Sequence, residues 1–205
     1  MLAIIDYGVG NLFSLSSALD YLGVLHTVTD QPDEIDQADR IILPGVGAFG
    51  DAMTHLSERD LIRVLVNQVV RGKPLLGICL GMQMLFERSF EFGEHVGLCF
   101  LTGSVVPLRE SIPDHFKVPH IGWNRLKFIR QDDPFLQFTQ EGDYVYYVHS
   151  YYVRDCADSM TAGSDYGTFI PGVVHKDNLF GTQFHPEKSG TVGLRILQAF
   201  CSFPI

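Results

Sequence analysis

Three groups of residues in this sequence have the types and spacing needed for nucleophilic attack on a carbonyl group. The first is GICLG, residues 77–81, where Cys79 stands between two glycines as an apolar run becomes a helical pattern. This is the thiol version of the G-x-S-x-G turn between a strand and a helix, and flanking glycines permit its close backbone approach. Such a turn places the sulfur at the amino end of the helix, which favours the thiolate, and directs the Leu80 N–H toward an oxyanion.

A second group would supply the base that a catalytic thiol needs. A free cysteine in an apolar stretch is also a common core residue, so GICLG alone leaves a structural interpretation open. GTQFHPEKSG, residues 181–190, contains a histidine with a carboxylate two positions on. If this segment is extended, His185 and Glu187 share a face. Alone they would be a surface pair in a turn, but with Cys79 they supply a nucleophile, a base and an orienting group.

The third group is the glycine-rich segment IILPGVGAFG, residues 41–50. It formally matches G-x-G-x-x-G, but a dinucleotide site expects an acidic residue about 20 positions further on, where a helical stretch runs through 69–71. We interpret it as a flexible turn at the end of a strand, which offers a second backbone N–H, from Val46 or Gly47, to the oxyanion. An ordinary strand-to-helix loop would have the same pattern.

The elements that would position these groups alternate between strand and helix in the first half of the chain. Apolar runs at LAIIDY, VLHTVT, RIILPG and PLLGIC predict buried strands, and the spacing of leucines over 12–22 and the stretch from about Glu58 to Arg71 predict helices. Short segments after residue 96, rich in Val, Tyr and Phe, predict antiparallel or mixed strands, and VGLRILQAF predicts a last helix. The pattern indicates one α/β domain over 1–205, with a mixed, mostly parallel central sheet and helices on both faces.

Composition excludes several classes of function. The 24 acidic and 15 basic residues give a net charge of -9, which would repel nucleic acid and anionic membranes. The amino terminus lacks the basic region of a signal peptide, and no uncharged apolar run approaches the ~18 residues of a spanning helix. Four cysteines without a CxxC pair fit neither a zinc site nor a disulfide framework. We therefore expect a soluble cytoplasmic protein that binds no nucleic acid, membrane or metal.

The order of these motifs resembles the class I, or triad, glutamine amidotransferases over essentially the whole chain, which implies a flavodoxin-like α/β fold. Finer motifs are similar to the glutaminase subunits of imidazole glycerol phosphate synthases, which act in histidine biosynthesis: DYGVGN, PGVGAFG, GICLGMQMLFE, PHIGWN, YVHSYY and FHPEKS. Met82 and the PHIGWN segment favour this subfamily over the purine, pyrimidine and anthranilate types.

The resemblance implies a glutaminase mechanism without a cofactor. Cys79 attacks the carboxamide of L-glutamine, His185 oriented by Glu187 protonates the departing ammonia, and water hydrolyses the thioester. The resemblance also implies an oxyanion site at Val46, Gly47 and Leu80, and substrate contacts from Gly45, Gln83, Glu91, His149, Ser150 and Tyr151. Two of these have structural alternatives: the charge-rich surroundings of Glu91 also suit a solvated surface, and strand aromatics such as Tyr151 are more often core or interface residues.

The triad and its supporting strands occupy the chain, so we expect the reaction that consumes ammonia to take place on another protein. The resemblance implies a heterodimer with a (β/α)8-barrel cyclase subunit, which Asn11, Trp123 and Lys188 would contact. A lone tryptophan such as Trp123 is, however, more often a core or rim anchor. A glutaminase that serves a different synthase is an alternative among enzymes. The alternative from another class is a redox or regulatory module with Cys79 as a sensor thiol, which would not need His185 beside Glu187.

Overall fold

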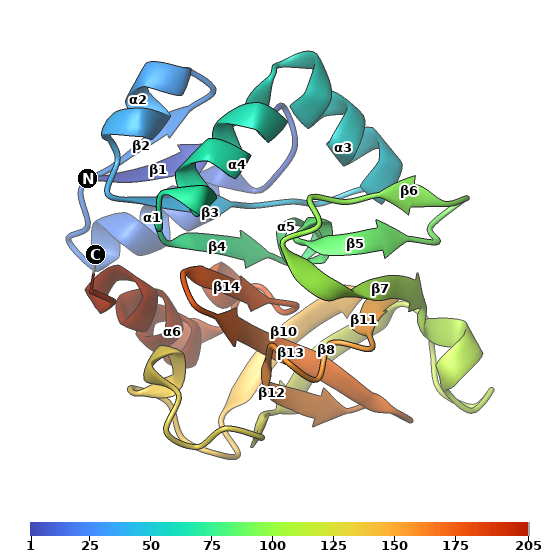
Figure 1. The fold of residues 1–205 in the computed structure, drawn as a ribbon. Coiled ribbons are helices and arrows are strands. Elements are labelled where there is room, and N and C mark those ends of the chain that lie inside the picture. The colour runs from blue at the N-terminus through green and yellow to red at the C-terminus, as the bar shows by residue number, and fades with distance from the viewer. Residues whose placement is uncertain (205) are drawn as a thin grey trace.

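A central eight-stranded sheet organises the structure, a computed structural model that describes residues 1–204 (Figure 1). In spatial order its strands are β2 (His26–Thr29), β1 (Leu2–Ile5), β3 (Arg40–Leu43), β4 (Leu75–Ile78), β14 (Leu179–Thr182), β13 (Phe169–Lys176), β12 (Met160–Asp165) and β9 (Lys127–Phe128). Neighbouring strands are parallel from β2 to β14 and antiparallel from β14 to β9. The sheet is therefore mixed, as the sequence predicted.

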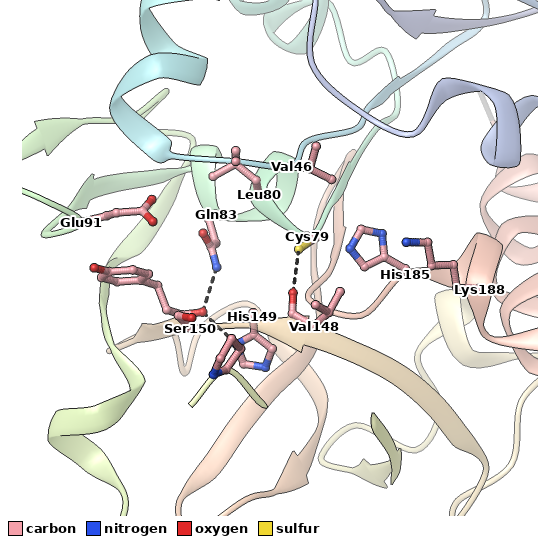
Figure 2. Close-up of a pocket in the computed structure, with 13 residues that line it drawn as sticks. Val46, Cys79, Leu80, Gln83, Glu91, Val148, His149, Ser150, His185 and Lys188 are labelled. Carbon is pink, nitrogen blue, oxygen red and sulfur yellow. Dashed lines mark hydrogen bonds between the residues drawn. The ribbon is translucent and has the colours of Figure 1, made fainter. Parts of the chain in front are cut away.

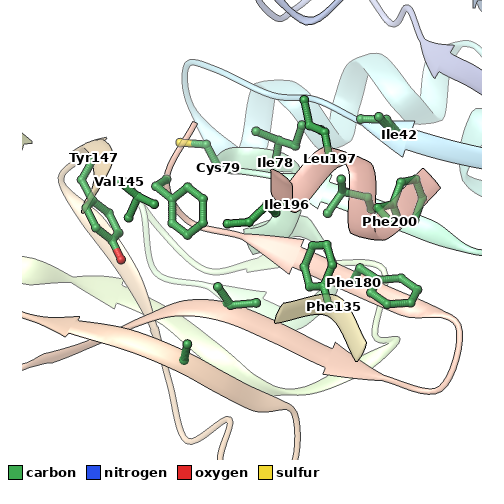
Figure 3. Packing of buried hydrophobic residues seen from close by; sticks show 14 of the residues in the cluster. Ile42, Ile78, Cys79, Phe135, Val145, Tyr147, Phe180, Ile196, Leu197 and Phe200 are labelled. Carbon is green, nitrogen blue, oxygen red and sulfur yellow. The ribbon is translucent and has the colours of Figure 1, made fainter. Parts of the chain in front are cut away.

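Helices cover both faces of the parallel half. They are α1 (Leu12–Tyr21), α2 (Pro32–Gln37), α3 (Phe49–Glu58), α4 (Leu61–Val70), α5 (Leu80–Met84) and α6 (Gly190–Ser202). Alternate residues of β3 divide between two buried clusters: Ile42 packs with α1 and α6, whereas Ile41 packs with α2, α3 and α4. Figure 3 shows the first cluster, where Ile196 and Phe200 of α6 pack near Ile78. The predicted α/β class with helices on both faces is confirmed.

Two smaller sheets extend from this core. One has the order β11 (Tyr151–Arg154), β7 (Leu101–Pro107), β5 (Phe86–Ser89) and β6 (His95–Val96), and the other pairs β10 (Tyr144–His149) with β8 (His120–Arg125). Short 3-10 turns are η1 (Leu108–Ser111), η2 (Pro134–Leu136) and η3 (Pro186–Lys188). Within residues 1–204, no helix has the length and apolar character to cross a membrane.

Two local predictions differ from the structure. The helix expected from about Glu58 begins instead at Leu61, after a separate helix α3, because Asp60 adopts a left-handed conformation with φ 56° that interrupts the chain between them. The extended segment expected through Glu187 ends earlier, because β14 stops at Thr182 and the chain turns into η3 at Pro186, which has no N–H to donate to a sheet.

The arrangement brings the three chemically interesting segments to one edge of the sheet. The strands β3, β4 and β14 are adjacent and parallel, so their carboxyl ends lie side by side. PGVG follows β3, Cys79 follows β4, and His185 comes shortly after β14. Ligands of open α/β sheets bind at such an edge.

Candidate active site

Cys79 lies on a sharp turn between β4 and α5. Its φ of 54° and ψ of -108° are unusual for a residue with a side chain and cost about 1–3 kcal/mol, which the surrounding structure must offset. The Cys79 N–H donates to the carbonyl of Thr182 at 2.7 Å, which ties the turn to β14. A Cβ on Gly77 would lie 2.6 Å from the Gly81 oxygen, and one on Gly81 would lie 1.9 Å from the Leu43 oxygen. Only glycine fits at either position, so the steric interpretation of GICLG is correct.

The PGVG turn packs directly on the sharp turn at residues 77–81 that carries Cys79, called the elbow below. A Cβ on Gly45 would lie 2.8 Å from the Gly81 nitrogen, so these two backbones are in contact. The Tyr7 hydroxyl donates to the Pro44 carbonyl at 2.8 Å and holds the start of the turn. Burial, with a contribution from Cys79, raises the pKa of Tyr7, so the hydroxyl stays a donor. Sequence reasoning missed Tyr7, although DYGVGN places it where the first strand ends.

His185 and Glu187 contact each other through the η3 turn. The imidazole Nδ1 lies 2.8 Å from Glu187 Oε1, and each side chain is 4% exposed. Because the carboxylate engages Nδ1, the opposite edge of the ring is free to face Cys79 (Figure 2). Burial lowers the pKa of His185, but hydrogen bonding and charge from Cys79 and Glu187 outweigh it and raise that pKa to about 10.

Ser189 fixes the backbone that carries this histidine. Its hydroxyl donates to the His185 carbonyl at 2.7 Å and accepts from the Tyr146 N–H at 3.0 Å. The His185 N–H in turn donates to the Tyr146 carbonyl at 3.1 Å. No local pattern predicted this role of Ser189, because Tyr146 lies on the distant strand β10.

A cavity of about 400 Å³ adjoins these groups and gathers most of the residues that the sequence singled out. Figure 2 shows it extending from Glu91 at one end, past Gln83, to Cys79 and His185 at the other. The predicted residues that line it are Val46, Gly47, Cys79, Leu80, Gln83, Glu91, His149, Ser150, Tyr151, His185 and Lys188. Gly45 is not among them and lines a small neighbouring void with Asn11, His185 and Glu187.

Glu91 is buried, which contradicts the alternative of a solvated acid. It is 8% exposed, and its Oε2 accepts from the Phe49 N–H at 2.7 Å, at the start of α3. Burial raises the pKa of Glu91, and the Phe49 N–H opposes that change. A buried carboxylate at one end of the cavity suits a ligand that carries a positive charge.

A hydrogen-bonded chain behind the cavity fixes the protonation of two histidines. The Tyr151 carbonyl accepts from His149 Nδ1 at 2.9 Å, so His149 Nε2 must accept from His120 Nδ1, also at 2.9 Å. Burial lowers the pKa of His149 to about 3 and that of His120 to about 4, so both rings are neutral at pH 7. They are structural donors that hold β8, β10 and the start of β11 together, and the sequence did not single out His120 by itself.

The three residues expected at a partner interface have different surroundings. Trp123 on β8 is 50% exposed and packs edge-to-face on Tyr146. The backbone carbonyl of Tyr146 accepts from the His185 N–H, so Tyr146 lies between Trp123 and the segment that carries His185. Lys188 is exposed where it lines the cavity, and Asn11 caps α1 by accepting from the Ser14 N–H at 3.4 Å.

Known proteins resemble this chain in both sequence and fold. Residues 3–202 match the family Glutamine amidotransferase class-I. Imidazole glycerol phosphate synthase subunit HisH of Bacillus velezensis is 51% identical over 203 residues, covering 98% of this chain and 95% of that protein. The HisH subunit of Bacillus subtilis is 49% identical with the same coverage. PurLQS from Thermotoga maritima shares the fold, with a TM-score of 0.75 at 20% identity over 98% of this chain and 96% of its own. The chain therefore belongs to the class-I glutamine amidotransferases and, within them, to the HisH subunits of imidazole glycerol phosphate synthase.

Proposed function

We propose that this chain hydrolyses L-glutamine to glutamate and ammonia through a thioester on Cys79, as the glutaminase of an imidazole glycerol phosphate synthase. One observation carries the proposal: Cys79, on a strained turn, lines the same cavity as His185, whose Nδ1 is held 2.8 Å from Glu187. A sensor thiol would need neither this imidazole nor its carboxylate. Nucleophile, base and orienting group are the requirements of covalent acyl transfer.

The first half-reaction forms the thioester and releases ammonia. The Cys79 thiolate attacks the carboxamide carbon, and the oxyanion that develops accepts hydrogen bonds from N–H groups of Leu80 and of the turn at Val46 and Gly47. The carbon–nitrogen bond breaks as the His185 imidazolium gives its proton to the leaving nitrogen. Neutral ammonia departs and a γ-glutamyl thioester remains.

The second half-reaction regenerates the thiolate. His185, now neutral, takes a proton from a water molecule as its oxygen attacks the thioester carbon. The carbon–sulfur bond breaks, and the thiolate and imidazolium are restored. The new γ-carboxyl group leaves as the acid and loses its proton to solvent, which gives glutamate. Glu187 orients the ring throughout and balances its charge in the protonated form.

The cavity suits the two ends of a glutamine molecule. Glu91 would bind the α-ammonium group at the end away from Cys79, since it is the buried carboxylate there. Gln83, with backbone groups of His149, Ser150 and Tyr151, would hold the rest of the substrate, and Gly45 would support this wall from behind. The reactive carboxamide would then lie beside Cys79.

Ammonia would pass to a (β/α)8-barrel cyclase subunit in a cytoplasmic heterodimer. The half-exposed indole of Trp123 and the exposed Lys188 suit such an interface, with Asn11 near the triad segment. The four free cysteines support a reducing compartment. The whole chain would act as one glutaminase domain, and the synthase reaction would belong to the partner.

Cys79→Ala tests this division of labour. In a complex with the cyclase subunit, the variant should lose glutamine-dependent synthesis and keep synthesis from added ammonia, because only the ammonia source is removed. Both rates are measured in the same preparation, with the unmodified complex as reference. Loss of both activities, or retention of glutamine-dependent synthesis, would contradict the proposal.

A further inference from the structure

A buried glutamine outside the triad contacts the sulfur of Cys79. Gln183 directly follows β14 and is fully buried, and its Nε2 lies 3.7 Å from Cys79 Sγ. Its Oε1 lies 3.0 Å from Nε2 of Gln83, and its backbone N–H donates to the Gly172 carbonyl at 2.9 Å. Gln183 does not line the cavity, so it is not a substrate contact.

The orientation of this amide follows from a backbone atom that cannot flip. The Tyr151 carbonyl oxygen only accepts, and it lies 2.9 Å from the Gln83 side chain, so the amide nitrogen of Gln83 must face it. The same nitrogen faces Gln183 at 3.0 Å, and turning Gln183 around would oppose two NH₂ groups. Gln83 therefore holds the oxygen of Gln183 and leaves its N–H directed at Sγ.

We propose that Gln183 is a catalytic hydrogen-bond donor to the Cys79 thiolate, oriented by Gln83. An N–H stabilises a thiolate far more than a neutral thiol or thioester, because the donor interacts with a full negative charge. Unlike the imidazole, an amide keeps its protons throughout the catalytic cycle. Gln183 thus favours the thiolate as nucleophile in the first half-reaction and as leaving group in the second, whatever the protonation state of His185.

This inference rests on the proposed function for the role of Cys79, but its test does not use glutaminase activity. The rate of Cys79 alkylation by iodoacetamide is measured against pH in the full chain, and peptide mass spectrometry separates Cys79 from the other cysteines. The midpoint of that profile reports how readily the thiolate forms. If the wild-type chain showed no glutaminase activity with any candidate partner, the proposed function would be wrong. The alkylation profile would still test the role of Gln183, because it does not depend on glutamine hydrolysis.

Gln183→Met removes the side-chain amide N–H and replaces the glutamine with an apolar side chain of similar length. We expect its alkylation midpoint to rise by about one pH unit, a tenfold loss of thiolate below the midpoint, as removal of a charge-assisted donor predicts. Gln183→Glu should shift the midpoint further, because it keeps an oxygen toward Gln83 and brings a carboxylate to the sulfur. Thr182→Val is the matched control: its hydroxyl is buried without a partner among residues 1–204, and the midpoint should not move.

A role in packing alone predicts a different result. If Gln183 only fills space, Gln183→Met should keep the wild-type midpoint, and that result in a variant with wild-type circular dichroism would overturn the inference. If Gln183→Met does not fold, Gln83→Met tests the same point, since it frees the Gln183 amide to rotate and should raise the midpoint by a smaller amount. An unchanged midpoint in both Gln83→Met and Gln183→Glu would also overturn it.

Discussion

At the residue scale, the chemistry depends on what happens to the charge of His185 during turnover. Hydrogen bonds and charge from Cys79 and Glu187 raise the pKa of His185 to about 10 in spite of burial, which favours the protonated ring. In the proposed mechanism, the sulfur loses its negative charge when it bonds to the carboxamide carbon, and the imidazolium then loses part of what stabilised it. The proton is therefore released most readily when ammonia is leaving.

His185→Asn and Glu187→Gln should differ in severity. The first removes both base and proton donor, so we expect a loss of about 10²–10⁴-fold in glutaminase turnover. The second keeps a side-chain oxygen that accepts from Nδ1 and loses only the charge, so some activity should remain. Turnover is measured in the complex, and unchanged synthesis from ammonia serves as control. A His185→Asn variant with nearly normal turnover would refute the assignment.

The four cysteines should react unequally with a glutamine-like electrophile. Burial raises the pKa of Cys156 and of Cys201 to about 11, so those thiols stay protonated at neutral pH. Cys99 is exposed but lies outside the cavity that would bind the reagent. We expect labelling at Cys79, slowed by excess glutamine, when peptides are analysed by mass spectrometry. Equal labelling of all four would count against Cys79 as nucleophile.

At the element scale, the elbow depends on backbone contact between three segments. A Cβ at Gly81 would lie 1.9 Å from the Leu43 oxygen, so Gly81→Ala must displace either the elbow or the end of β3. We expect a loss of stability of about 1–3 kcal/mol by chemical denaturation, together with loss of glutaminase activity. Gly72→Ala is the control, because it lies in open space and carries only the cost of its φ of 86°. Equal losses of glutaminase activity from the two substitutions would refute the contact argument.

Local patterns predicted the elements well where one segment decides its own structure. The apolar runs gave β1 to β4, and leucine spacing gave α1, because burial of one face dictates these periods. The break at Asp60 was missed because a single left-handed residue leaves the helical pattern of its neighbours intact. The contact between His185 and Glu187 was predicted, but by way of a strand rather than the observed 3-10 turn.

The candidate site was predictable only in part, because short motifs reveal some of its residues and contacts between distant segments determine the others. Cys79, His185 and Glu187 carry their chemistry in short motifs. The positions of Tyr7, His120 and Gln183 matter because of residues distant in sequence: the hydrogen bond from Gln83 to Gln183 spans 100 positions. Nothing in a local pattern reports such a pairing.

At the scale of the whole molecule, we predict that the partner controls the glutaminase. Val46 is exposed and Gly47 has a φ of 95° with open space around it, so the second half of the PGVG turn has room to reorient an N–H toward the oxyanion, although its start is packed. The isolated chain should hydrolyse glutamine slowly, and a barrel partner with its nucleotide ligand should accelerate it, by ~10²–10³-fold if one oxyanion donor is gained. Activity is compared for the chain alone, with apo partner, and with liganded partner.

Variants at the expected interface provide the control for this prediction. Trp123→Ala and Lys188→Ala should reduce the acceleration by the partner more than they weaken glutamine binding to the chain. The gated model would be wrong if the isolated chain already had full activity. It would also be wrong if both variants kept the full response.

The position of β14 between β4 and β13 has a consequence for how the protein is made. Cys79 and its contact Gln183 are 104 positions apart, and His185 comes later still. A chain leaving the ribosome can form the parallel strands β1 to β4 with their helices long before β14 exists. Pairing across so long a separation is also among the slower steps of folding. During synthesis the thiol is therefore present without its base, and glutamine hydrolysis can begin only when the last strand has joined the sheet.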